Sequence, residues 1–143
     1  MAHFEGHLDL QLAEGPDGRP LTRDGRSTWS VNAPLAYDDG RQRIVVPDGF
    51  ITDLASIPRP VWNLVPPDGP WAKAAVIHDF LYATRGTGVV SDGSCGIDKP
   101  GGYTRAEADQ VLDDAMACLG VPFLTRLAIW SAVRAGGGRG WGR

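Results

Sequence analysis

A chain of 143 residues is long enough to bury one hydrophobic core, and no linker or repeat divides it, so we expect a single domain. Its hydrophobic content of 43% and charged content of 22% are typical of globular proteins. A net charge of -3 argues against nucleic-acid binding. No apolar run approaches the length of a membrane span, and the start lacks a basic stretch before an apolar one. We therefore expect neither a transmembrane segment nor a signal peptide.

The first half of the chain predicts short antiparallel strands joined by tight turns. Asp-Gly pairs recur along it, and this dipeptide favours the positive φ angles of hairpin turns. Alternating or β-branched apolar residues predict strands within residues 3–12, 27–37 and 41–47, and a brief strand at Phe50–Ile51. The proline-rich run that follows, up to residue 70, predicts an ordered loop.

The second half predicts helices. Apolar residues recur at helical spacing from Trp71 to Tyr82, with Asp68 as the expected N-cap and Pro70 in the first turn. After a glycine-rich loop, Thr104 and Glu107 fit a capping box that opens a second helix. Pro122 starts a third helix, and its expected apolar face carries Phe123, Leu127, Trp130 and Val133.

These elements predict an α+β fold. Residues 1–69 form short antiparallel strands and loops, and residues 70–135 form two or three helices packed against them. Residues 136–143 form a flexible tail unless Trp141 enters a pocket. Two cysteines do not make a disulfide framework, so we expect free thiols.

The run "AAVIHDFLYATRG" places a histidine and an aspartate side by side in an otherwise apolar helix. His78 lies near the centre of the apolar face, Tyr82 lies one turn later on that face, and Asp79 lies about 100° away at its edge. Asp109 lies at the edge of the apolar face of the second helix, so antiparallel packing would bring it to His78. A carboxylate bonded to an imidazole N–H fixes the tautomer and raises the basicity of the ring, which suits a general base or a metal ligand.

A structural interpretation stands beside this one. A buried His78 bonded to a backbone carbonyl, with Asp79 solvated at the helix edge, needs no function. The polar loop "TDLASIPR" is either a set of local turns with an ion pair or a segment that leans over the helix and completes a site. In the second case the loop, with Asp53, joins His78 and Asp79, and Asp79 is free to hold a cation or polarise a substrate. The remaining site-supporting residues are then Ser56, Arg59 and Arg105.

Three motifs follow one another along the chain, "GFITDLASIPRPVW", "AAVIHDFLYATRG" and "TRAEADQVLDDAMACLGVP". In these motifs and in their order, the chain resembles the family known as domain of unknown function 1353 (DUF1353). The resemblance runs from about Pro47 to Arg134. That family is common in bacteriophage and prophage genomes, and its activity is not established. The resemblance implies a phage origin, in which small proteins serve as virion parts, lysis-region enzymes or accessory factors.

The run "HDFLY" is also similar to the His-Asp-x-x-Tyr core of secreted and prokaryotic phospholipase A2 enzymes. This similarity implies that His78 is a general base and Asp79 a calcium ligand. It also implies that Asp109 orients His78, with Tyr82 as its hydrogen-bond partner. The glycine-rich calcium loop and the disulfides of those enzymes are not recognisable here. Asp53 would have to replace the missing carbonyl ligands.

Two functions therefore remain open. The first is a metal-assisted hydrolase of a lipid or cell-envelope ester, in which His78 activates water and Asp109 orients His78. Asp79 and Asp53 then hold a divalent cation, and calcium is the expected ion. The second is a non-enzymatic component of a phage tail, baseplate or head that contacts other phage structural proteins. We expect the protein in the cytoplasm of a bacterial host during infection or within the virion. No nucleophile-elbow or phosphate-binding glycine motif points to another class.

Overall fold

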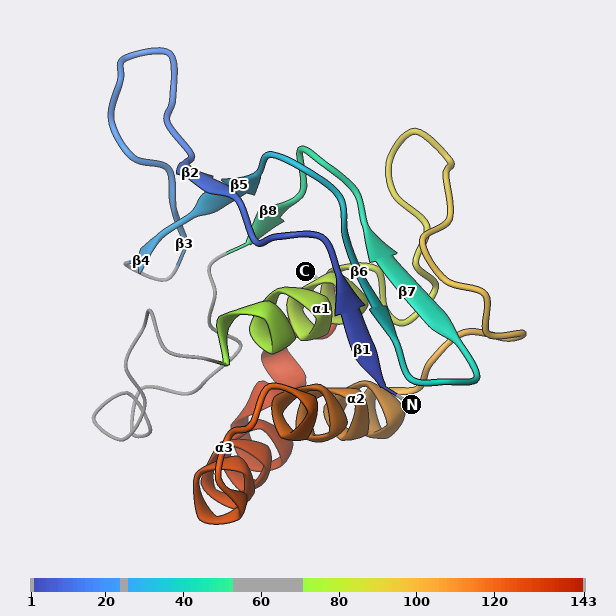
Figure 1. Cartoon of the computed structure of the whole chain (residues 1–143). Helices are drawn as coiled ribbons and strands as arrows, with labels where there is room; N and C mark the ends of the chain where they lie inside the picture. Colours follow the sequence, from blue (N-terminus) through green and yellow to red (C-terminus); the bar gives the residue numbers. More distant parts are fainter. Residues whose placement is uncertain (1, 24–25, 53–70, 143) are drawn as a thin grey trace.

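The computed structural model describes residues 2–23, 26–52 and 71–142 (Figure 1). Strands occupy the N-terminal part of the chain and three helices occupy the C-terminal part, so the predicted α+β class is confirmed. The loop residues Asp53, Ser56 and Arg59 lie outside the described residues, as do the predicted helix cap Asp68 and Pro70.

The described strands form three small antiparallel sheets. The first has the order β1-β6-β7, the second β2-β5-β8, and the third is the hairpin β3-β4. In the first sheet Tyr37 lies opposite Phe4 on one side and Ile44 on the other. The bounds are β1 His3–Glu5, β2 Leu10–Leu12, β3 Thr22–Arg23, β4 Arg26–Ser27, β5 Trp29–Val31, β6 Leu35–Asp38, β7 Arg43–Val46 and β8 Ile51–Thr52.

Helix α1, Ala72–Ala83, is the centre of the molecule. Figure 1 shows it between the strands on one side and the other two helices on the other. It contacts β7, β8 and α2, and every residue from Ala74 to Tyr82 is buried. The expectation of a single apolar face with Asp79 at a solvated edge is therefore wrong, because neighbours cover the helix on all sides and leave Asp79 6% exposed.

Helix α2, Arg105–Cys118, begins where the sequence predicts. The Thr104 hydroxyl accepts a hydrogen bond from the backbone N–H of Glu107, and the Glu107 carboxylate accepts one from the backbone N–H of Thr104. This reciprocal capping box is confirmed. A good N-cap contributes about 1 kcal/mol to the stability of a helix. The capping box therefore fixes where the first turn of α2 begins, and with it the face of the helix on which Asp109 lies.

Helix α3, Phe123–Gly136, packs on α2 through a face that was predicted only in part, since Val133 is buried as expected. Its buried residues are Ile129 and Val133, at helical spacing with the part-buried Arg126. Phe123 is 62% exposed and Leu127 44% exposed, so the predicted apolar face is wrong for its first two turns. In these turns the face toward α2 carries Arg126, which donates to Asp113 of α2 at 2.9 Å.

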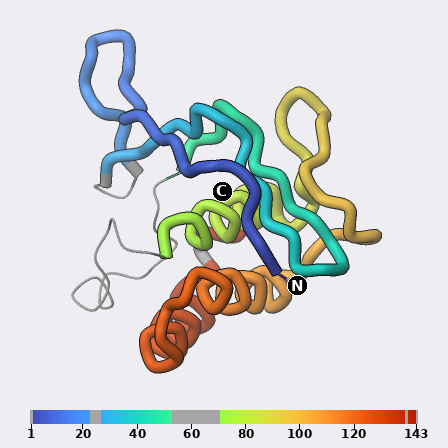
Figure 2. The backbone as a smooth tube through the Cα atoms, in the orientation of Figure 1, coloured from blue at the N-terminus to red at the C-terminus, as the bar shows by residue number. Residues whose placement is uncertain are grey.

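The C-terminal segment folds back onto α1. After α3, residues Gly137–Gly140 form a short 3-10 helix, η2, and the Trp141 ring meets the Tyr82 ring edge-on at 5.1 Å between centroids. The backbone N–H of Gly142 donates to the carbonyl of Tyr82 at 2.7 Å. Figure 2 shows this end of the chain beside α1. The segment expected to be a flexible tail is thus packed against the end of α1.

The glycine-rich connection between α1 and α2 is tied to the first sheet. The backbone N–H of Val45 donates to the carbonyl of Gly96 at 2.6 Å, and that of Arg43 donates to the Asp98 carboxylate at 2.8 Å. Figure 2 shows the connection running beside β7. Cys95 in this loop and Cys118 at the end of α2 are both free, as expected, and both are exposed.

Candidate functional site

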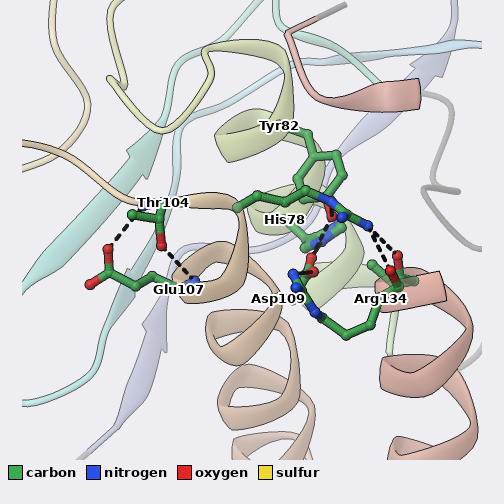
Figure 3. Close-up of polar contacts among 8 residues, drawn as sticks. His78, Tyr82, Thr104, Glu107, Asp109 and Arg134 are labelled. Carbon is green, nitrogen blue, oxygen red and sulfur yellow. Dashed lines mark hydrogen bonds and ion pairs between the residues drawn. The ribbon is translucent and has the colours of Figure 1, made fainter. Parts of the chain in front are cut away.

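A buried polar network lies where the three helices meet (Figure 3). Helix α1 contributes His78 and Tyr82, α2 contributes Arg105 and Asp109, and α3 contributes Arg134. We call these five residues the Asp109 network. All of its polar contacts converge on, or lead to, the carboxylate of Asp109, which is fully buried.

The dyad expected from helical spacing is present in the geometry. His78 Nε2 lies 2.8 Å from Asp109 Oδ1, and the Tyr82 hydroxyl donates to the same oxygen at 2.6 Å. The pairs 78–109 and 82–105 show that α1 and α2 run antiparallel, which is the arrangement that the dyad requires. His78 is 1% exposed, so this contact is shielded from water.

Arg134 is a member of the network that the sequence did not reveal. Its Nη1 donates to Asp109 Oδ2 at 2.7 Å, and its side chain is 34% exposed. Arginine near the end of an amphipathic helix usually extends its charge to solvent. Its acidic partner lies on another helix, 25 residues earlier, so no local spacing signals the pair.

Arg105, expected to support the site, reaches it through Tyr82. Its Nε donates to the Tyr82 hydroxyl at 3.1 Å. Its Nη2 donates to the backbone carbonyls of Val133 and Arg134 at 2.9 and 3.0 Å. These carbonyls belong to the last turn of α3, where a cation is stabilised by the helix dipole. Arg105 therefore joins all three helices.

The electrostatics of the network give its members defined charges. Burial would raise the pKa of Asp109, but hydrogen bonds from His78, Tyr82 and Arg134 outweigh it and hold the pKa below its ordinary value. Burial lowers the pKa of His78, and the Arg105 charge adds to this lowering while Asp109 opposes it. Burial also raises the pKa of Tyr82, with help from Asp109. At neutral pH Asp109 is thus ionised, and His78 and Tyr82 are neutral.

The charge of Asp109 settles which nitrogen of His78 carries the proton. An ionised carboxylate only accepts hydrogen bonds, so the neutral ring donates from Nε2. Its Nδ1 is then the unprotonated nitrogen. The imidazole is therefore held in the form that a general base requires.

A metal centre is not formed by the described residues alone. Asp79 is buried next to His78 on α1, whereas Asp53 lies outside the described residues. Within ranges 2–23, 26–52 and 71–142, no three His, Cys, Asp or Glu side chains are grouped so that they could hold a metal ion. The calcium prediction thus depends on Asp53, which lies outside the described residues.

We expect the free energy of unfolding to fall as the pH is lowered from 7 to 5. The folded-state pKa of His78 lies below its unfolded value of 6.5, so the unfolded chain binds more protons in this window. Stability that is present above pH 6.5 is therefore lost on acidification, and the depressed pKa of Asp109 extends the loss below about pH 4. Urea unfolding at pH 7 and at pH 5 measures this loss of stability. Between these two pH values, His78→Gln should lose less free energy of unfolding than the wild type. An equal loss in the variant contradicts a buried neutral His78.

Comparisons with known proteins place the chain in a family without assigning it an activity. The family model described as "Protein of unknown function (DUF1353)" matches residues 29–133. Uncharacterized protein y4jT of Sinorhizobium fredii (strain NBRC 101917 / NGR234) is 33% identical over 77 residues, which is 52% of this chain and 23% of that protein. The chain thus covers less than a quarter of this relative's length.

No solved structure matches the chain. None of the helices in the described residues is both long and apolar enough to cross a membrane. The family match spans β5 to the last turns of α3 and includes the whole Asp109 network apart from Arg134. This chain belongs to the DUF1353 family of proteins of unknown function.

Proposed function

We propose that this protein is a hydrolase in which His78 acts as a general base oriented by Asp109. The observation that supports it is the 2.8 Å contact between His78 Nε2 and Asp109 Oδ1. That contact leaves the lone pair of Nδ1 to accept a proton. A general base must be neutral near pH 7, and the lowered pKa of His78 meets this requirement.

The proposed reaction is hydrolysis of an ester bond in a lipid or in a component of the cell envelope. In the proposed step, His78 Nδ1 removes a proton from water while the water oxygen forms a bond to the ester carbonyl carbon. The imidazolium that forms is stabilised by the negative Asp109. The ester C–O bond then breaks, and the same proton passes from His78 to the leaving alkoxide. The ring returns to its neutral state, so protons and electrons balance.

We expect His78→Gln to lower kcat by about 100-fold or more, because a positioned general base contributes about that much. Glutamine keeps an N–H that can donate to Asp109 but has no basic nitrogen at the Nδ1 position. The assay measures hydrolysis of p-nitrophenyl butyrate and of phosphatidylglycerol in mixed micelles, each with calcium and with a chelator. The exposed His7, changed to Gln, is the matched control and should leave the rate unchanged.

Loss of rate in the chelator would support a cation at Asp79, and an unchanged rate would remove the metal from the proposal. Equal rates from the wild type and His78→Gln overturn the general-base role. Absence of hydrolysis with both esters overturns the ester hydrolase itself.

A second candidate is a non-enzymatic component of a phage virion. It is favoured by the near-complete burial of the dyad, with His78 1% and Asp109 0% exposed, and by hydrogen bonds that connect three helices. In that case the network only stabilises the helices. His78→Gln would then lower the melting temperature with no activity to lose, and the protein would sediment with intact particles from a phage lysate.

A further inference from the structure

We propose that Arg134 is a positioning residue that fixes the carboxylate of Asp109 and, through it, the orientation and tautomer of His78. This inference deepens the proposed function and rests on it for its catalytic meaning. The DUF1353 match ends at residue 133, so the family comparison does not include Arg134.

The two oxygens of Asp109 are held by different helices. Oδ1 accepts from His78 and Tyr82 of α1, and Oδ2 accepts from Arg134 of α3. In the described part of the chain, Arg134 is the one donor to Oδ2. Because Asp109 is 0% exposed, water cannot replace this donor without a change in packing. Removing Arg134 would leave a buried carboxylate oxygen without a partner, which is costly enough to make the group rotate or take up a proton.

Arg134 is itself held by the network that it completes. Arg105 donates from Nη2 to the backbone carbonyl of Arg134 and from Nε to the Tyr82 hydroxyl. Tyr82 then donates to Asp109, and the Arg134 side chain closes the ring on Oδ2 (Figure 3). The Asp109 carboxylate is therefore held from both sides, and His78 Nε2 meets an acceptor whose direction is fixed.

A second arginine–aspartate pair joins the same two helices without touching the histidine. Arg126 of α3 donates to Asp113 of α2 at 2.9 Å, close to the 2.7 Å of the Arg134–Asp109 pair. Arg126 lies two turns before Arg134, and Asp113 lies one turn after Asp109. This pair stabilises the contact between α2 and α3. A variant at Arg126 therefore tests the effect of weakening that contact without removing a donor to Asp109.

The test is the imidazole NMR spectrum of protein labelled with 15N-histidine, at neutral pH. We expect wild-type His78 to give an Nε2–H signal shifted downfield and protected from exchange with water. His78→Gln assigns this signal among the three histidines. In Arg134→Met we expect the signal to lose its downfield shift and to exchange rapidly. Arg134→Lys, which restores a cationic donor, should recover part of the shift, and Arg126→Met should leave the signal unchanged.

An unchanged His78 signal in Arg134→Met overturns the positioning role, and so does loss of the signal in Arg126→Met. If Arg134→Met does not fold, partial loss of the downfield shift in Arg134→Lys supports the role and an unchanged signal overturns it. In an active protein, Arg134→Lys should lower kcat by about tenfold with little change in KM. The NMR result does not require activity, so failure of the hydrolase proposal and failure of the positioning role are seen separately.

Discussion

Asp109→Asn should lower the free energy of unfolding by about 3 kcal/mol at pH 7, because it removes the acceptor that three donors share. Asparagine has the same shape but presents one oxygen and one NH2 group. If its oxygen faces His78 and Tyr82, its NH2 meets the guanidinium of Arg134, and donor then faces donor. If it turns over, the two fully buried donors of α1 lose their acceptor. Either arrangement leaves buried polar groups unsatisfied.

The matched control for this substitution is Asp113→Asn, one turn further along α2. Asp113 also pairs with an arginine of α3, Arg126, but its side chain is 27% exposed. Such partly exposed pairs contribute about 1 kcal/mol or less. Urea unfolding of both variants at pH 7 measures the difference. Similar losses in the two variants would contradict the central role of Asp109.

The sequence allowed much of the fold to be predicted where local chemistry decides the structure. The Thr104–Glu107 capping box places the start of α2, and Asp-Gly turns with apolar alternation locate most strands. The hairpin β3-β4 was not expected, because two-residue strands carry too few side chains to show alternation. The complete burial of α1 was missed, because burial on all sides depends on the neighbours that a helix acquires in the fold.

The same distinction holds for the candidate site. His78 and Tyr82 share a face through helical spacing, and antiparallel packing with α2 brings in Asp109 as expected. Arg134 was not found, because its contact depends on the rotation of α3 about its axis. That rotation was predicted incorrectly from Phe123 and Leu127, which are exposed. Apolar spacing identifies a face, but the partner helix determines which face is buried.

The C-terminal segment packs against a member of the network, Tyr82 of α1. Trp141 covers one edge of the Tyr82 ring, and the Tyr82 carbonyl accepts from Gly142. His78 also contacts this tyrosine, with ring centroids 4.2 Å apart, and both His78 and Asp109 are buried. Hydrogen bonds to Asp109 are stronger in such a dry environment than they would be in water.

The second large effect is expected at Gly86, where the loop between α1 and α2 closes. Gly86 has a φ of +76°, and a Cβ built on it would lie 1.8 Å from the carbonyl oxygen of Tyr103. The Gly86 carbonyl accepts from the backbone N–H of Tyr103 at 2.9 Å, so the two segments are in direct backbone contact. We expect Gly86→Ala to cost about 3 kcal/mol or more. Left-handed geometry accounts for about 1–2 kcal/mol, and displacement of the hydrogen-bonded backbone adds about 1–3 kcal/mol.

Gly93→Ala in the same loop separates these two contributions. Gly93 also has a positive φ, +85°, but a Cβ there would meet no atom within 4 Å. Its substitution should therefore lower the free energy of unfolding only by the cost of placing alanine at a positive φ, about 1–2 kcal/mol. Gly86 lies one turn after Tyr82, and Tyr103 lies two residues before Arg105, so a shift at this crossing moves both ends of the Tyr82–Arg105 contact. Urea unfolding compares the variants, and equal costs would show that the crossing can relax without strain. A larger cost for Gly86→Ala, with loss of the His78 Nε2–H signal, would show that closure of this loop sets the register between α1 and α2.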